Sequence, residues 1–588
     1  DEILSHIDPI LIPNSYRDNH PQRQTKLVDR LTYDVLGTPR GTTKFARVKL
    51  VKSAVKKSKS PPLKYQEAIK DPLIRKSMFD ELTNLFISKA VKLVDIPPDK
   101  KPISNVWVHK LKFENGIFER ARSRICPRGF EQTAHVDYDP DDIASPTLSL
   151  DTGMLSLGIE VERSQHSVLV DVDSAYMLYA EPDHEIYMEI PDGMIKVPNK
   201  ALLMQHSLQG TKQGARDWHE HANRTILKLK FKRSTIDPCF YYRWDGECFT
   251  QIALYVDDFR IASDNKEMLD QVVNEIANIY KIKVKPATWW LGMNIEHLRE
   301  SGLLKINMKQ SIIDLLNDFG MADCKPERTP AAPNTKLVKP NQESTELEYE
   351  VTNFKYRELV GALLWIARTG RPDILYAVGQ LTQFNHLWDN SHIIAAKRVL
   401  RYLKGTMELN LTLTKSINED NLLLRCFADS DFASEPEEND LPMRSISGMV
   451  AYLHGIGPIY SSASLEKTIS LSTAEAEYKA TSKAAQYCIG IRSLLNEIGF
   501  PQDEPTIIYN DNQACVTMVK QKFSSSRTRH IKLKFHHIRE AIDNNEIKVE
   551  YMPTDEMIAD IMTKALDRIK FERIRDMLMN GQLLSKHK

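Results

Sequence analysis

The segment IALYVDDFRIAS, residues 252–263, places two adjacent carboxylates inside an apolar run, and this feature most constrains the fold. The apolar residues on both sides predict a buried β-hairpin with Tyr255, Asp257 and Asp258 at its turn. Burying an unpaired charge is costly, and two like charges side by side also repel each other. A chain with this segment therefore has to provide or bind a positive partner for the two aspartates.

A second apolar strand has the same unusual feature. In VLVDVDSAY, residues 168–176, Asp171 follows an apolar run. An acidic pair alone is more often a turn, but three carboxylates at the ends of two strands form an oxygen-rich site. Such a site suits two Mg²⁺ ions, which would neutralise the charges. Two ions about 3.5–4 Å apart stabilise both the attacking and the leaving oxygen of an in-line phosphoryl transfer.

Composition narrows the class of protein. A chain of 588 residues is too long for one core and predicts several domains. The 79 basic and 79 acidic residues balance, so a nucleic-acid partner has to be argued from local patches. No apolar run approaches the roughly 20 residues that span a bilayer, so no membrane partner is expected. Seven cysteines without a CxxC pair favour reduced thiols in an intracellular protein.

Local patterns predict the order of elements. Residues 1–64 have little pattern and end in a basic, proline-closed segment, which predicts a linker, with a nuclear-import or nucleic-acid-binding tail as the alternative. The start at Asp1 rather than Met suggests a piece of a longer polypeptide. The further predicted elements are a helical segment from about residue 65, a hairpin turning at Glu114-Asn115-Gly116, a helix over about 151–165, a mostly helical segment over 286–415, and strands followed by alternating helix and strand over 420–588.

A series of ordered blocks now points to a family. Together with YVDD and DVDSAY, they resemble the reverse transcriptase of copia-type (Pseudoviridae) LTR retrotransposons, in the reverse transcriptase–ribonuclease H portion of the Pol polyprotein. The resemblance runs from about residue 65 to the end of the chain. The blocks are YQEAIKDP, WVHKLKF, RGFEQ, EIYMEIPDGM, GTKQGARDW, LGMNIE, TGRPDILYAVGQLTQF, AAKRVLRYLKGT, STAEAEYKA and YNDNQACV.

The resemblance implies an α+β multidomain fold. It would consist of a right-hand polymerase with fingers, palm and thumb, then a helical connection and an α/β ribonuclease H-like domain. The implied domains are a basic linker or integrase-tail remnant (1–64), fingers and palm (65–285), a mostly helical thumb and connection (286–415), and the ribonuclease H domain (420–588).

The resemblance also implies roles at the polymerase site. Asp171, Asp257 and Asp258 would hold the metal ions, with a main-chain contact from Val172 to the metal-bound triphosphate. Tyr176 matches an aromatic steric gate that favours dNTPs over ribonucleotides; a core aromatic is the alternative.

Three more residues would complete the nucleotide pocket. Arg122 and Arg124 alternate onto one strand face and would grip the triphosphate, with a solvated strand face as the alternative. Gln213 matches a glutamine beside the pocket, and LGMN at 291–294 would lie against the primer strand.

The last block has its own carboxylates. The resemblance to the ribonuclease H fold implies that they hold two further Mg²⁺ ions, which activate a water to cut the RNA of a hybrid. Glu475 competes with Glu477, and Asp431 competes with Asp429; the EYKA match favours Glu477, and Asp429 is preferred. The implied set is Asp429 in a strand, Glu477 in a helix, Asp511 at a strand end and Asp560 in a helical segment.

The chain departs from related sequences in some places. The segment YMPTDEMIAD lacks the histidine that many ribonucleases H carry before the last aspartate, which leaves water or Asp555 to move the proton. His530, His536 and His537 are predicted to lie on a structural or hybrid-contacting helix face. The Asp151-Thr152-Gly153 triplet resembles an aspartic protease motif but is interpreted as the cap of the following helix.

These observations favour a bifunctional enzyme over a decayed or domesticated copy that only binds nucleic acid or serves a structural role. The enzyme would be an RNA-directed and DNA-directed DNA polymerase with ribonuclease H activity that copies retrotransposon RNA into DNA. Its implied cofactor is Mg²⁺, with Mn²⁺ as an alternative, and its implied partners are an RNA template, a DNA primer, an RNA–DNA hybrid and dNTPs, with a homodimer or integrase as further candidates. The implied location is a cytoplasmic virus-like particle, with later nuclear entry. All seven carboxylates are present, and decay strikes such residues early.

Overall fold

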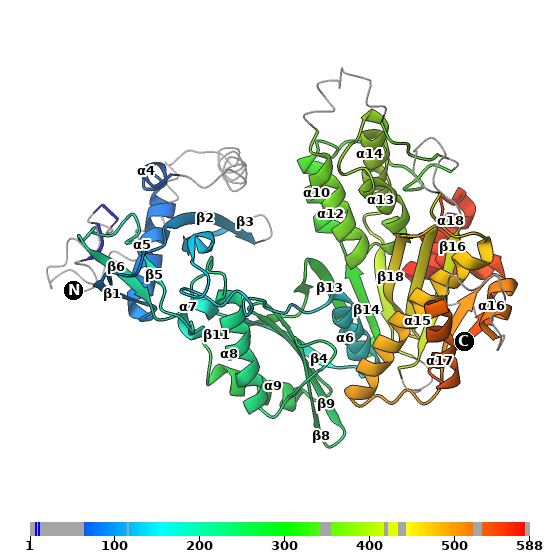
Figure 1. Cartoon of the computed structure of the whole chain (residues 1–588), viewed down its shortest axis with the longest axis horizontal. Helices are drawn as coiled ribbons and strands as arrows, with labels where there is room; N and C mark the ends of the chain where they lie inside the picture. The colour runs from blue at the N-terminus through cyan, green and yellow to red at the C-terminus, as the bar shows by residue number, and fades with distance from the viewer. Residues whose placement is uncertain are drawn as a thin grey trace. The chain divides into compact units, whose positions relative to one another are not determined.

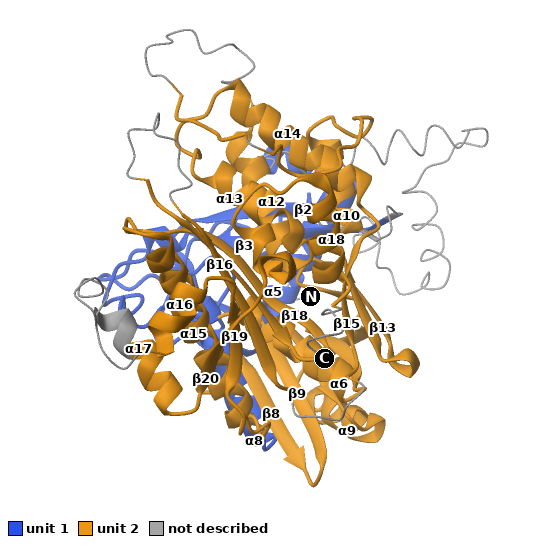
Figure 2. Cartoon of the chain, turned by 90° about the vertical axis from the view of Figure 1, so that its right-hand side faces the viewer, with its two compact units in different colours: residues 1–146, 172–230 blue, residues 147–171, 231–588 orange. Residues whose placement is uncertain are grey.

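The computed structural model describes most of the chain beyond residue 63. The described ranges are 6–8, 10–11, 64–114, 117–333, 335–340, 354–416, 422–432, 443–520 and 532–581. Most of the predicted linker, the turn residues Asn115 and Gly116, and His530 lie outside them, as does the side chain of His536. The chain divides into two compact units, unit 1 (residues 1–146 and 172–230) and unit 2 (residues 147–171 and 231–588), coloured separately in Figure 2.

Unit 1 has its core around helix α5 (Pro72–Ile87), labelled in Figure 1. The helix begins at Pro72 because the Asp71 carboxylate accepts the Leu73 amide hydrogen at 2.9 Å and proline fits the first helical position. Its buried side chains pack on the strands, and the predicted hairpin forms as β2 (Asn105–Glu114) paired with β3 (Ile117–Pro127). The other elements are the sheet β1-β6-β5 (Val91–Asp95, Lys200–Met204, Tyr187–Met188) and helices α4 (Tyr65–Ala68), α7 (Ala175–Tyr179) and α8 (Gly214–Lys228).

A six-stranded sheet carries the acidic hairpin and, apart from Val172, belongs to unit 2. The predicted helix near 151–165 is confirmed as α6 (Leu150–Glu162), which packs on β9. Its cap is not Asp151 as predicted but Ser149, whose hydroxyl accepts the Thr152 amide hydrogen, and Asp151 lies in the first turn. The strand order of the six-stranded sheet is β11 (Ile282–Pro286), β4 (His166–Val172), β10 (Asp258–Ser263), β9 (Cys248–Tyr255), β8 (Phe240–Asp245) and β7 (Lys232–Arg233). Helix α9 (Lys266–Ala277) follows β10 in the chain.

Residues 286–415 contain a sheet as well as helices, which differs from the expected mostly helical segment. In β13, Met293 and Ile295 are buried while Asn294 and Glu296 are exposed, a period of two that suits a half-buried strand. The sheet is β12 (Trp289–Trp290), β13 (Met293–Leu298), β14 (Leu303–Asn307) and β15 (Asn410–Thr414), and the helices are α10 (Lys309–Asp318), α12 (Tyr356–Thr369), α13 (Leu375–Thr382) and α14 (Asn390–Gly405).

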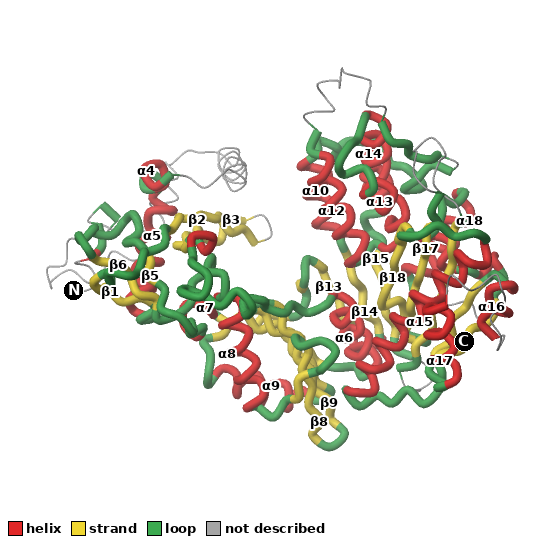
Figure 3. Tube along the Cα trace, viewed as in Figure 1, coloured by secondary structure: helices red, strands yellow, loops and turns green. Residues whose placement is uncertain are grey.

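The C-terminal part of unit 2 is a five-stranded sheet covered by helices, with strands yellow and helices red in Figure 3. Helix α15 (Thr473–Glu497) packs on the central strand. The order is β18 (Gly457–Leu465), β17 (Ile446–Leu453), β16 (Leu424–Asp431), β19 (Thr506–Asn510) and β20 (Ile547–Tyr551), with α16 (Gln513–Lys520), α17 (Lys532–Asp543) and α18 (Arg568–Met579). The first three strands are antiparallel and the last two run parallel to the centre.

The strand order of this sheet is 3-2-1-4-5 in chain order. Together with the other sheets and the helices it confirms the predicted α+β multidomain fold. Among the described helices, none is both long and apolar enough to cross a bilayer.

Candidate active sites

The acidic hairpin forms as predicted, with a two-residue turn. Asp258 pairs with Tyr255 across the hairpin, which leaves Val256 and Asp257 as the turn residues. Val256 has a φ of 56°, a conformation that is strained for a β-branched residue. Backbone strain of this kind persists only where the surrounding structure enforces it, and it is found most often at functional sites.

The structure brings Asp258 and Asp171 together as direct partners on the neighbouring strands β10 and β4. Residues in such positions have Cβ atoms about 4.5–5.5 Å apart, so the two carboxylates repel each other. All three aspartates are half-buried rather than fully buried, which lowers the cost that the sequence suggested. Lys285 on β11 supplies one positive charge, with its Nζ 3.3 Å from Asp171 Oδ2.

A fully buried ion pair supports the hairpin. Arg260, two residues beyond Asp258, places its Nη2 2.7 Å from Oε2 of Glu160 on α6. Glu160 Oε1 also accepts the Ser167 hydroxyl at 2.7 Å and contacts His297 Nδ1 at 3.0 Å. Burial alone would raise the pKa of Glu160, but Arg260, His297 and Ser167 outweigh it and lower this pKa to about 2.

This ion pair leads to a stability prediction. Glu160→Gln leaves Arg260 charged and uncompensated in the interior, so we expect the free energy of unfolding in urea to fall by about 3–5 kcal/mol. Asp270→Asn is the control, because Asp270 pairs with Lys266 on the surface and should cost less than about 1 kcal/mol. Equal stability of Glu160→Gln and the parent would contradict the assigned role of the pair.

The lowered pKa also determines the direction of the pH dependence. Because the folded state holds Glu160 ionised down to about pH 2, its contribution is complete above the unfolded pKa of about 4.5 and is lost as the pH falls through 2. The difference in stability between the parent and Glu160→Gln should therefore shrink as the pH falls from about 4.5 to 2.

The predicted nucleotide-pocket residues lie in unit 1. Val172 is buried at the end of β4, and Tyr176 is half-buried in α7. Arg122 and Arg124 are half-buried on one face of β3, alternating with the buried Ser123 on the other face.

Gln213 has a place that the sequence did not indicate. It is buried at the start of α8, where its Oε1 accepts from Gln132 Nε2 at 2.9 Å and its Nε2 donates to the Asp137 carbonyl at 2.8 Å. The same region joins two of the sequence blocks, because Gly129 and Gly210 approach so closely that a Cβ on Gly129 would lie 2.3 Å from the Gly210 carbonyl oxygen. Gln132 was missed as a residue of this region, although RGFEQ contains it.

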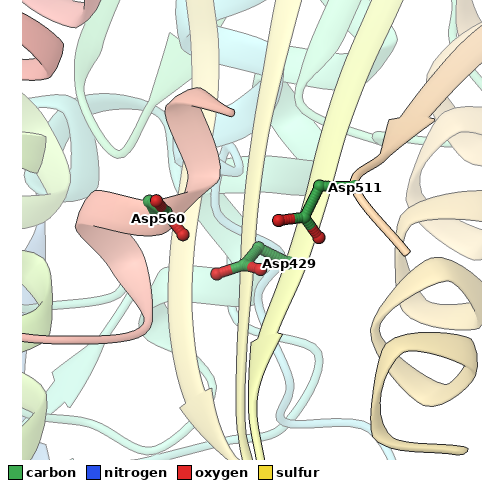
Figure 4. Close-up of side chains that lie close together, drawn as sticks. All are labelled: Asp429, Asp511 and Asp560. Atoms are coloured by element: carbon green, nitrogen blue, oxygen red, sulfur yellow. The ribbon is translucent and has the colours of Figure 1, made fainter. Parts of the chain in front are cut away.

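A second acidic site lies at the five-stranded sheet of unit 2 (Figure 4). Asp429 on β16, Asp511 after β19 and Asp560 in the 3₁₀ turn Ile558–Met562 bring one carboxylate oxygen each within 4.8 Å of one another. Among the described residues, this is the one group of three side chains with ligand atoms so close together. The set Asp171, Asp257 and Asp258 is therefore less tightly gathered.

Glu477 lies beside this cluster, and Glu475 points elsewhere. Glu477 accepts the Ser430 amide hydrogen at 3.2 Å and the Asn510 side-chain amide at 2.9 Å. Glu475 accepts the Leu471 amide hydrogen and pairs with Lys479 at 2.9 Å. Asp431, at the end of β16, is half-buried, whereas Asp429 is 2% exposed.

The cluster has an electrostatic need for a cation. Burial is the main cause that raises the pKa of Asp429, and it outweighs the opposing effect of Lys564. Asp560 and Asp511 raise this pKa further, whereas the hydrogen bond from Thr563 lowers it. Burial and the neighbouring Asp429 likewise raise the pKa of Glu477. Buried oxygens of this density are the ligands that Mg²⁺ and Mn²⁺ prefer, so the residues fit a divalent cation.

Several neighbours of the cluster were not predicted from the sequence. Thr554 donates to Asp511 Oδ2 at 2.8 Å, and Thr563 donates to Asp429 Oδ2. Lys564 and Lys570 both form ion pairs with Asp560. The block MIADIMTKAL contains two of them, but only the fold shows which carboxylates they contact.

Comparisons of the sequence with known proteins identify related proteins. The family model described as reverse transcriptase (RNA-dependent DNA polymerase) matches residues 88–333. The chain is 30% identical over 511 residues to the retrovirus-related Pol polyprotein from transposon TNT 1-94 of Nicotiana tabacum, covering 86% of this chain and 38% of that protein. It is 31% identical over 312 residues to a putative transposon Ty5-1 protein of Saccharomyces cerevisiae, covering 53% of this chain and 97% of that protein.

The chain thus spans little more than a third of the length of the plant relative. A solved structure of the foamy viral protease-reverse transcriptase in complex with ds DNA aligns with 92% of this chain and 85% of its own, at 11% identity and a TM-score of 0.41.

Proposed function

Since the chain belongs to the family of retrovirus-related Pol polyproteins from copia-like transposons, we propose that it is a reverse transcriptase with ribonuclease H activity. The polymerase activity is supported by the pairing of Asp171 with Asp258 beside the Asp257 turn, inside the segment that the family model matches. The ribonuclease H activity is supported by the cluster of Asp429, Asp511 and Asp560.

At the polymerase site, Asp171, Asp257 and Asp258 would hold divalent cations at the end of two strands. When bound, such cations stabilise the attacking and leaving oxygens of an in-line phosphoryl transfer. Arg122 and Arg124 would bind the triphosphate through their forked donors, and Val172 would supply a main-chain contact. Tyr176 would exclude a ribose 2′-hydroxyl, which selects dNTPs.

At the second site, Asp429, Glu477, Asp511 and Asp560 would orient a cation and the RNA strand of a hybrid for hydrolysis. Thr554 and Thr563 would keep two of these carboxylates in place through their hydroxyls. Gln213 would act indirectly, by positioning Gln132 and the Asp137 backbone near the start of α8.

Family membership supports the remaining proposals. The substrates would be an RNA template, a DNA primer, dNTPs and the RNA–DNA hybrid, and the domains would be those expected from the sequence blocks. A homodimer or an association with integrase, and a virus-like particle as the location, are proposed on the family alone. The presence of all seven carboxylates in the sequence supports an active enzyme over a decayed copy.

Removal of divalent cations tests the function. In the presence of EDTA, we expect the chain to lose about 100-fold or more of its primer extension on an RNA template and of its cleavage of an RNA–DNA hybrid. Added Mg²⁺ or Mn²⁺ should restore both, measured by gel analysis of labelled strands. Failure of the chain to extend a primer or cut a hybrid in Mg²⁺, or activity that resists EDTA, would reject the proposal.

A further inference from the structure

The cluster of Asp429, Asp511 and Asp560 already holds a positive group of the chain itself. Lys564 Nζ lies 2.6 Å from Asp560 Oδ1 and 4.0 Å from Asp429 Oδ2. The side chains of Asp560 and Asp429 are 0% and 2% exposed, whereas that of Lys564 is 37% exposed. The lysine therefore reaches from a partly open side of the cluster to its two most buried carboxylates.

This ammonium and a divalent cation would need the same oxygens. Two of the three carboxylates whose oxygens gather within 4.8 Å are the two that Lys564 contacts. Positive charges only a few ångströms apart repel strongly where water is largely excluded. Both cations therefore cannot occupy these oxygens at the same time.

The surroundings allow Lys564 to leave without disrupting the site. Lys570 on α18 pairs with the other oxygen of Asp560, so this carboxylate keeps a counter-charge. Thr563 donates to Asp429, which anchors the backbone next to Lys564. A lysine is a hydrated point charge on a flexible stem, so a rotation of its own side chain can carry the ammonium into water.

We propose that Lys564 is the resident counter-cation of this site and is displaced when a divalent cation binds, so that it sets the affinity for that cation. The inference rests on the proposed function, because it requires the cluster to bind a divalent cation. When no divalent cation is bound, Lys564 keeps the carboxylates together and the site preformed. The affinity for the divalent cation is correspondingly lower than the carboxylates would give without Lys564.

Calorimetric titration with Mn²⁺ tests this competition. All proteins would carry Asp257→Asn/Asp258→Asn, which leaves the ribonuclease H-like site as the one under study. We expect Lys564→Gln to bind Mn²⁺ about tenfold more tightly than this parent, because the competing charge is gone. Lys564→Arg keeps the charge and should bind no more tightly than the parent.

The chain offers a matched control. Lys483 pairs with Glu466 at 2.7 Å, is also 37% exposed, and contacts a carboxylate that is 4% exposed. Because Glu466 is not one of the clustered carboxylates, Lys483→Gln should leave the Mn²⁺ affinity unchanged.

A second measurement needs no variant at Lys564. Acylation of lysines in the parent, followed by mass spectrometry, should show Lys564 becoming several-fold more reactive when Mn²⁺ is added, with Lys483 unchanged. Unchanged or lower reactivity of Lys564, or an Mn²⁺ affinity of Lys564→Gln equal to that of the parent, would overturn the inference about Lys564. Neither result would reject the proposed cation site. If the parent shows no Mn²⁺ binding that Asp429→Asn abolishes, the proposed cation site itself fails.

Discussion

Asp257→Asn/Asp258→Asn is expected to lower RNA-templated primer extension by at least about 1000-fold, which corresponds to about 4 kcal/mol of transition-state stabilisation. Asparagine keeps the volume of each side chain but removes the charges that would hold divalent cations beside Asp171. Asp258 is the direct cross-strand partner of Asp171, and Asp257 lies at the adjoining turn, so the loss should be confined to this end of the sheet. The measurement is single-turnover extension of a DNA primer at saturating Mg²⁺ and dNTP.

The stability of this double variant separates chemistry from folding. Neutralising Asp258 relieves its repulsion with Asp171 on the paired strand. In the absence of a cation, the free energy of unfolding should therefore stay the same or rise by up to about 1 kcal/mol. Asp270→Asn, on the surface of α9, should keep extension within about twofold of the parent. Extension within tenfold of the parent in the double variant would remove these aspartates from the polymerase site. A loss of stability would assign the defect to folding instead.

The second large effect is expected for Asp429→Asn, which should lower cleavage of an RNA–DNA hybrid by at least about 1000-fold. Asp429 lies at the centre of the second site, near Asp511 and Asp560, and accepts a hydrogen bond from Thr563. Neutralising it removes one oxygen ligand and one charge from a set that depends on their number. Extension should stay within about twofold of the parent, since the acidic hairpin is on another sheet.

Asp431→Asn is the matched control for this prediction. Asp431 lies two residues further along β16 and is half-buried, but it is not in the group whose oxygens gather within 4.8 Å. Its replacement should lower cleavage by less than about tenfold. The opposite ranking of the two variants would make Asp431 the ligand, and loss of extension together with cleavage in Asp429→Asn would mean that the two sites are not independent.

The elements that carry the acidic residues could be predicted because their signals are local. Asp257 and Asp258 interrupt an apolar strand pair, and the strand alternation around them places the turn within one or two residues. The blocks around Asp429, Glu477, Asp511 and Asp560 have a spacing that indicates a strand, a helix, a strand end and a helical turn, and the structure has these elements at those positions. The EYKA match favours Glu477 over Glu475, and in the fold Glu477 contacts Asn510 and the Ser430 amide, whereas Glu475 pairs with Lys479.

Other parts of the molecule gave no usable local signal. The sheet β12-β13-β14-β15 was not predicted, since its strands are short and its last member is supplied more than 100 residues later in the chain. Likewise, no local pattern indicates that both ends of the Gln213 amide are bonded to other residues of unit 1, and its place beside a nucleotide stays a prediction.

The sequence by itself determined the family resemblance and the elements on which the acidic residues lie, because motifs and apolar periodicity depend on neighbours a few positions apart. Only the tertiary structure decided how the charges are compensated. Glu160 meets Arg260 100 residues further along the chain, Lys285 reaches Asp171, and Lys570 joins Lys564 at Asp560. The stability of an ion depends on which groups packing brings within a few ångströms, and long-range packing is not written in any local pattern.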